Sequence, residues 1–149
     1  MTIEYKGKQI EAYSLPLMKK FAQEILHGEK TIEIRTMSER NYAMFMDKDK
    51  IAANEKLIDE GRGEECVLAM KEVFAIHFYD RGGHFEINVL VDELGVGQMT
   101  KKWVKEMNEK FNFHDYDNGW QKYDGLPDDK IPMFFWFHIE EVLSHKGLD

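Results

Sequence analysis

The sequence has few of the residues that build disulfide-bonded or zinc-stabilised proteins. It contains one cysteine, Cys66, and three prolines among its 149 residues. A single cysteine excludes an intramolecular disulfide and a cysteine-rich zinc site. We therefore expect a protein of the reducing cytoplasm.

Long apolar runs are also missing. The longest, at residues 131–139, is interrupted by His138 and is far too short to cross a bilayer. Residues 1–14 contain no apolar run, so we expect no signal peptide and no association with a membrane.

The composition is nevertheless that of a folded protein. Hydrophobic residues make up 43% of the chain, charged residues 32% and aromatic residues 13%, which argues against extensive disorder. No internal repeat, low-complexity stretch or proline-rich linker divides the sequence. We therefore expect residues 1–149 to form a single domain.

Positive charge is scarce overall but unevenly distributed. The net charge is −8, which argues against a broad phosphate-binding surface and makes a long nucleic-acid duplex an improbable partner. Residues 1–50, however, hold nine basic against eight acidic residues, whereas residues 51–149 hold eleven against twenty. A local positive site is therefore expected in the first third.

Hydrophobic periodicity predicts an α+β protein. Ser14 is expected to cap a helix that has Pro16 in its first turn and ends at Gly28. Strict alternation predicts a strand at residues 29–36. Further on we expect a helical turn at 42–46, a short strand at 50–54, and a hairpin of strands at 66–78 and 85–91. A helix at 98–111, with an apolar stripe in the core, precedes a closing strand at 133–139. Five to six mostly antiparallel strands with two main flanking helices favour a small barrel or a curled sheet.

The junction between the first helix and the following strand concentrates charged residues. Lys30 stands at the mouth of the strand, and Glu33 and Arg35 share one strand face. Arginine can form paired hydrogen bonds to a phosphate or a base edge, and lysine can hold an anion or act as a base. The alternative interpretation is a surface strand with a Glu–Arg pair worth less than about 1 kcal/mol.

The segment Ile-Leu-His-Gly-Glu-Lys-Thr-Ile-Glu-Ile-Arg, at residues 25–35, with the amphipathic helix before it, resembles the opening motif of ASCH domains. The resemblance covers residues 17–35. It implies a PUA-like β-barrel, a fold often associated with RNA, with a ligand cleft at the helix–strand junction. Some small bacterial ASCH proteins are amidohydrolases of acetylated cytidine, and at least one relative is a ribonuclease.

The sequence departs from the pattern of these amidohydrolases. Their lysine corresponds to Lys30, but their catalytic threonine corresponds to Glu33. Gly97 stands where they have a glutamate before the second helix. Thr31 offers a hydroxyl but points to a different strand face from Lys30. If the protein is a hydrolase, Lys30 and Glu33 are the expected catalytic residues.

The remaining motifs carry weaker signals. The aromatic loop at residues 112–129 includes Trp120, which is predicted either to stack on a nucleobase or to anchor the loop. The six histidines lack metal-ligand spacing; His77 and His138 are interpreted as core or rim residues, and residues 115–126 do not fit a calcium loop. We expect no metal and no cofactor.

The leading functional hypothesis is a binding module for RNA, a nucleotide or a nucleoside, with ligand-binding residues Lys30, Thr31, Glu33, Arg35 and Trp120. The first alternative is a hydrolase that acts on a modified nucleoside or on RNA. The second is a protein-interaction module without a small ligand.

Overall fold

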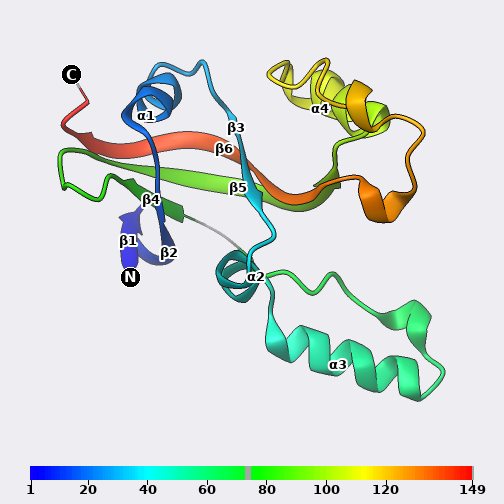
Figure 1. Ribbon diagram of the computed structural model, residues 1–149. Coiled ribbons are helices and arrows are strands. Elements are labelled where there is room, and N and C mark those ends of the chain that lie inside the picture. Colours follow the sequence, from blue (N-terminus) through cyan, green and yellow to red (C-terminus); the bar gives the residue numbers. More distant parts are fainter. Residues whose placement is uncertain (73–74, 149) are drawn as a thin grey trace. The chain divides into compact units, whose positions relative to one another are not determined.

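The computed structural model describes residues 1–72 and 75–148, which fall into two compact units (Figure 1). The larger unit contains residues 1–36 together with the described residues from 75 onwards. The smaller unit contains residues 37–72, which come between two strands of the larger unit in the sequence. All of the residues expected at the helix–strand junction belong to the larger unit.

The described strands of the larger unit form one mixed sheet of six strands in the order β1-β2-β4-β5-β6-β3. The strand bounds are β1 Thr2–Tyr5, β2 Lys8–Pro16, β3 Ile32–Thr36, β4 Ala75–Tyr79, β5 Glu86–Gln98 and β6 Met133–Lys146. Among these strands, only the pairing of β2 with β4 is parallel. The predicted α+β class is confirmed, and the six strands fall within the five to six mostly antiparallel strands that were expected.

The expected barrel is wrong, because the sheet is open. β1 and β3 occupy its two edges, and no ladder between described residues joins them to each other. Alternation in a sequence shows which residues share a face of a strand, but it does not show whether the last strand pairs with the first. The two predicted helices are present, and the described residues of the smaller unit add two more.

Strand β2 replaces the predicted start of the first helix. Ser14 and Pro16 pair in parallel with His77 and Tyr79 of β4, so Ser14 does not cap a helix. Helix α1 instead comprises Lys19–Leu26, and Gly28 follows it with a positive φ of 76°. The parallel partner lies about sixty residues away in the sequence, so local periodicity could not reveal it.

Helices α2, Glu39–Phe45, and α3, Lys48–Asp59, lie in the smaller unit. The predicted strand at 50–54 is wrong, because the Asp47 carboxylate accepts hydrogen bonds from the backbone N–H groups of Asp49 and Lys50 and so caps α3. The helical turn expected at 42–46 is part of α2.

The predicted hairpin is present with different strand lengths. The expected strand at 66–78 is wrong over its described N-terminal part, because β4 begins only at Ala75. Before it, Met70 forms an isolated bridge with Met46. Residues 73–74 of the expected strand lie outside the described residues. β5 and β6 are both longer than expected, because each pairs with the other along most of its length.

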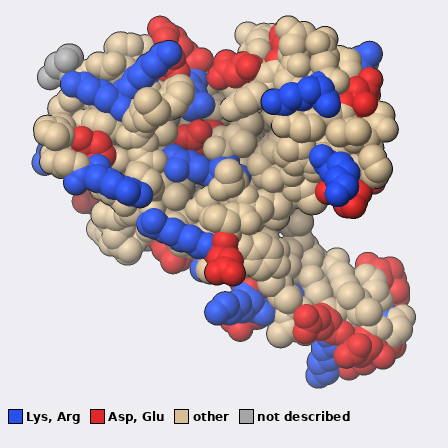
Figure 2. All heavy atoms as spheres, in the orientation of Figure 1, with Lys and Arg blue, Asp and Glu red and all other residues tan. Residues whose placement is uncertain are grey.

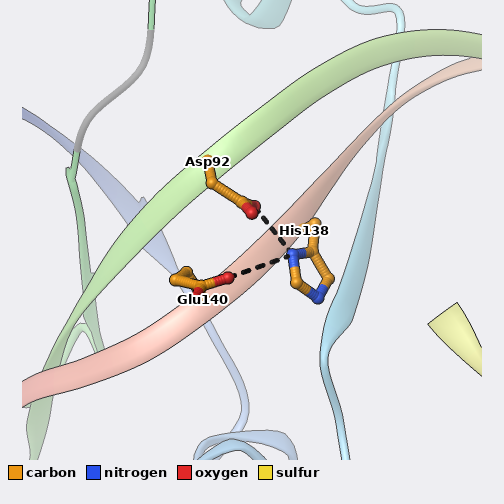
Figure 3. Close-up of side chains that lie close together, drawn as sticks. All are labelled: Asp92, His138 and Glu140. Atoms are coloured by element: carbon orange, nitrogen blue, oxygen red, sulfur yellow. Dashed lines mark hydrogen bonds and ion pairs between the residues drawn. The ribbon is translucent and has the colours of Figure 1, made fainter.

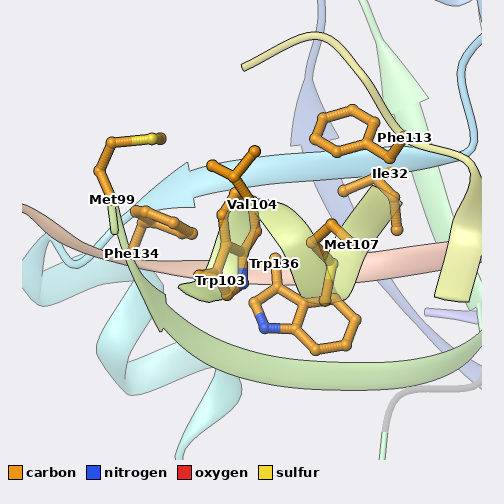
Figure 4. Packing of buried hydrophobic residues seen from close by; sticks show 8 residues of the cluster. All are labelled: Ile32, Met99, Trp103, Val104, Met107, Phe113, Phe134 and Trp136. Atoms are coloured by element: carbon orange, nitrogen blue, oxygen red, sulfur yellow. The ribbon is translucent and has the colours of Figure 1, made fainter. Parts of the chain in front are cut away.

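Helix α4, Lys101–Phe111, packs on β3 and β6 through one apolar cluster (Figure 4). We call this the α4 core cluster; it consists of Ile32, Met99, Trp103, Val104, Met107, Phe113, Phe134 and Trp136. Ile34 and Phe111 pack against it from the side. The predicted core stripe of this helix is therefore confirmed.

Among the described residues, no helix has both the length and the apolar character that a membrane span requires.

Candidate functional site

Strand β3 divides its residues between two faces of the sheet. Ile32 is fully buried in the α4 core cluster, and Ile34 packs beside it. Because side chains alternate along a strand, Glu33 and Arg35 point to the opposite face. The edge position of β3, with β6 as its only neighbour in the strand order, leaves these two charged residues near the rim of the sheet.

The structure brings the three charged residues of the motif together; we call them the β3 charge cluster. Lys30 Nζ lies 3.7 Å from Glu33 Oε1, and Arg35 Nη2 lies 3.3 Å from Glu33 Oε2. The side chains of Lys30 and Glu33 are each 10% exposed, and that of Arg35 is 18% exposed. This is not the solvated Glu–Arg pair of the alternative interpretation, because most of each side chain is out of water.

Neighbouring elements hold both cations in place. Arg35 Nη2 donates a hydrogen bond of 2.7 Å to the carbonyl oxygen of Pro16 at the end of β2, and the guanidinium lies 5.8 Å from the ring centre of Phe78 in β4. Lys30 Nζ lies 5.3 Å from the ring centre of Phe21 in α1. These cation–π contacts stabilise charges that have lost part of their hydration.

Figure 1 shows β3 running between α1 and α4, and Figure 2 shows basic and acidic side chains next to one another over this region. Such an arrangement presents hydrogen-bond donors and acceptors of both signs to a ligand.

The negative charge of Glu33 also acts on Tyr116, which lies in the loop after α4. Partial burial raises the pKa of the Tyr116 phenol, and the negative charges of Glu33 and Asp115 raise it further. At neutral pH the phenol therefore keeps its proton and can donate a hydrogen bond. Its ring also packs at 5.9 Å from that of Phe113. The sequence pointed to Tyr116 only as one aromatic of a long loop, without its charged neighbour.

We expect Tyr116 to lose its proton at a higher pH than an ordinary tyrosine, and Glu33→Gln to lower its pKa towards the ordinary value. Because the folded state holds this proton more tightly, the free energy of unfolding should fall as the pH rises above about 10. In Tyr116→Phe the free energy of unfolding should decrease less over the same pH range. Nuclear magnetic resonance of the tyrosine ring carbons measures the pKa; an identical value in wild type and Glu33→Gln would contradict the proximity of the two groups.

The two other predicted ligand-binding residues have different surroundings. Thr31 precedes β3, and its carbonyl oxygen accepts a hydrogen bond of 2.8 Å from the backbone N–H of Ile139. Trp120 packs against the α4 core cluster, and its indole N–H donates a hydrogen bond of 2.8 Å to the carbonyl oxygen of Asp117. For Trp120, the structure therefore favours the anchoring of the loop.

A second group of polar side chains, which sequence reasoning missed, lies on β5 and β6. His138 Nδ1 is 2.7 Å from Asp92 Oδ1 and 4.0 Å from Glu140 Oε2 (Figure 3). The expectation of a core or rim position fits the partial burial of His138, but the two carboxylates beside it were not foreseen. The spacing of His138 and Glu140 was a signal, since alternate strand residues share a face.

No protein-family model, curated protein or solved structure matches the chain. The resemblance to ASCH domains therefore stays an interpretation of the motif at residues 17–35.

Proposed function

We propose that the β3 charge cluster binds a small anionic ligand of the nucleotide type, either a free nucleotide or the end of a single-stranded RNA. The observation that carries this proposal is the charge imbalance of the cluster: Lys30 and Arg35 share the single carboxylate of Glu33. A largely buried group with one excess positive charge is stabilised by an incoming anion such as a phosphate.

The neighbouring groups favour a nucleotide over a bare anion. The carboxylate of Glu33 accepts hydrogen bonds, and amino groups on a base edge supply them. Tyr116 offers a phenol donor and a partly exposed ring, on which a base can stack. The resemblance of residues 17–35 to ASCH domains, which are similar to RNA-associated PUA domains, supports the same class of ligand.

The ligand is proposed to be short, because the rest of the surface repels phosphates. The chain carries a net charge of −8, which opposes a long phosphate track outside the cluster. The dependence of affinity on salt should therefore be shallow, corresponding to roughly one to three released counterions.

We expect Arg35→Ala to weaken binding of a nucleoside 5′-monophosphate by about 1.5–3 kcal/mol, because charge-assisted hydrogen bonds are lost. Lys30→Gln should also weaken binding. This variant keeps the hydrogen bond between Arg35 and the carbonyl oxygen of Pro16. Lys146→Ala is the control; its side chain is 82% exposed at the end of β6 and should have almost no effect. The measurement is a thermal-shift screen with the four monophosphates, nucleosides and short RNAs, followed by titration calorimetry.

Two results would contradict the proposal. One is the absence of a thermal shift with every nucleotide and RNA in the screen. The other is an equal loss of affinity in Arg35→Ala and Lys146→Ala, which would indicate diffuse electrostatic binding. Chromatography of the same mixtures detects any product, and turnover that is lost in Lys30→Gln and Glu33→Gln would favour the hydrolase alternative.

A further inference from the structure

The carboxylates of Asp92 and Glu140 converge on one ring nitrogen, Nδ1 of His138 (Figure 3). The donor atoms of these three residues all lie within 4.8 Å of one another. The described residues of the chain form two other close His–Asp pairs, His84 with Asp80 and His114 with Asp117. Neither of those pairs belongs to a described group of three potential ligands.

An irregularity in the ladder between β5 and β6 creates this group. Val91 pairs with Ile139 and Glu93 pairs with His138, so Asp92 is an extra residue without a partner in the register. Such a β-bulge redirects side chains and recurs next to functional sites. His138 and Glu140 are alternate residues of β6 and share a face. Glu140 also lacks a partner in the register, because Leu90 pairs with Glu141 and Val91 with Ile139. Two irregularities of the ladder thus place the two carboxylates beside His138.

The imidazole is also held in its orientation. The ring of His138 stacks on that of Phe111 with their centres 4.4 Å apart and their planes at 21°. Its side chain is 17% exposed, whereas the side chains of His84 and His114 are 78% and 52% exposed. A ligand that is pre-oriented in this way loses little conformational freedom when an ion binds.

The electrostatic surroundings favour a cation. Two carboxylates adjoin one imidazole. A separate open cavity of about 470 Å³ is lined by Glu93, Glu106, Met107, Glu109, Lys110 and Trp136, and by none of the three proposed ligands. Glu93 connects the two regions in the chain, since it follows Asp92 and pairs with His138 in the register. Lys110 is engaged by Glu93 at 2.6 Å. The carboxylates of Glu93, Glu106 and Glu109 add acidic groups to this side of the larger unit.

We propose that Asp92, His138 and Glu140 form a binding site for a divalent first-row transition-metal ion. An imidazole nitrogen with two carboxylate oxygens suits Zn²⁺ or Mn²⁺. Three protein ligands leave at least one coordination position for water or another small ligand. The proposal is independent of the nucleotide site, since it uses none of the residues of the β3 charge cluster.

The ligand distances require only small side-chain movements. Donor atoms around a tetrahedral ion with bonds of about 2.0–2.1 Å lie about 3.3 Å apart. Asp92 must therefore retreat slightly from its 2.7 Å contact with His138, and Glu140 must approach from 4.0 Å. Their side chains are 43% and 53% exposed, so both have room to move. A bound ion would take the place of the contact between His138 Nδ1 and Asp92 Oδ1.

The test is titration calorimetry of the full chain, freed of metal with a chelator, with ZnCl₂ and with MnCl₂. We expect one equivalent of at least one of these ions to bind, and Asp92→Asn and Glu140→Gln each to weaken that binding at least about tenfold. Glu140→Gln keeps the contact between His138 and Asp92, so it separates a metal site from a simple hydrogen-bonded pair. His84→Ala is the matched control and should leave the affinity unchanged.

Three results would overturn the proposal. The first is no saturable binding of either ion at millimolar concentration. The second is an affinity of Glu140→Gln equal to that of the wild type. The third is an equal loss in His84→Ala, which would indicate adventitious binding by surface histidines. Thermal unfolding of each metal-free variant confirms that the fold is retained, and the exposed position of Glu140 makes that variant the safest.

Discussion

Replacing Glu33 with glutamine is expected to lower the free energy of unfolding by about 3 kcal/mol, because breaking a buried ion pair leaves an uncompensated charge. The substitution preserves the shape of the side chain and removes only its charge. Lys30 and Arg35, whose side chains are at most 18% exposed, would then repel each other in a partly dehydrated environment. Urea denaturation with unchanged cooperativity is the measurement.

Glu65→Gln is the matched control for this prediction. Glu65 forms an ion pair with Arg62 whose side chains are about half exposed, so water and salt screen the loss and the stability should change little. A second variant, Glu33→Gln with Arg35→Met, removes one cation together with the carboxylate and should recover part of the loss. Equal stability of Glu33→Gln and the wild type would show that water reaches the cluster freely.

Gly97→Ala is expected to destabilise the larger unit by about 2–3 kcal/mol through overpacking. An added Cβ would lie 2.5 Å from Trp103 Nε1 and 2.9 Å from Phe134 Cε2. Both rings are buried in the α4 core cluster and contact each other edge to face at 4.7 Å, so neither can move without disturbing the other. Chemical denaturation followed by tryptophan fluorescence measures the loss.

Gly119→Ala supplies the comparison for Gly97→Ala. Its added Cβ would meet the flexible end of Met99 at 3.3 Å and the backbone of Tyr116 at 3.4 Å, which slight rotation of the methionine relieves. We expect its effect to be well under half that of Gly97→Ala. Comparable losses at the two positions would mean that the α4 core cluster adapts easily to additional volume.

Local patterns predicted those parts of the fold whose determinants are close in the sequence. Alternation separated Ile32 and Ile34 from Glu33 and Arg35. The four-residue spacing of Trp103 and Met107, continued from Met99 just before the helix, marked the buried face of α4. Both patterns record which side of an element meets the core.

Parts that depend on distant partners could not be predicted in this way. Ser14 and Pro16 suit a helix start, yet pairing with β4 draws them into a strand. The same holds for the sites. The charge of Glu33 acts on Tyr116, which is more than eighty residues away in the sequence, and Asp92 meets His138 where the ladder contains an extra residue.

The position of β3 at the edge of the sheet has a consequence for self-association. An exposed edge strand invites a strand of another molecule to extend the sheet, which is a common route to aggregation. The carboxylate of Glu33 already accepts a hydrogen bond of 3.1 Å from the backbone N–H of Ile34, so this donor of β3 is not free to pair with an added strand. Inward-pointing charges at an edge make such growth unfavourable. The residues proposed to receive a ligand would thus also help to keep separate molecules of this protein from joining into a continuous sheet.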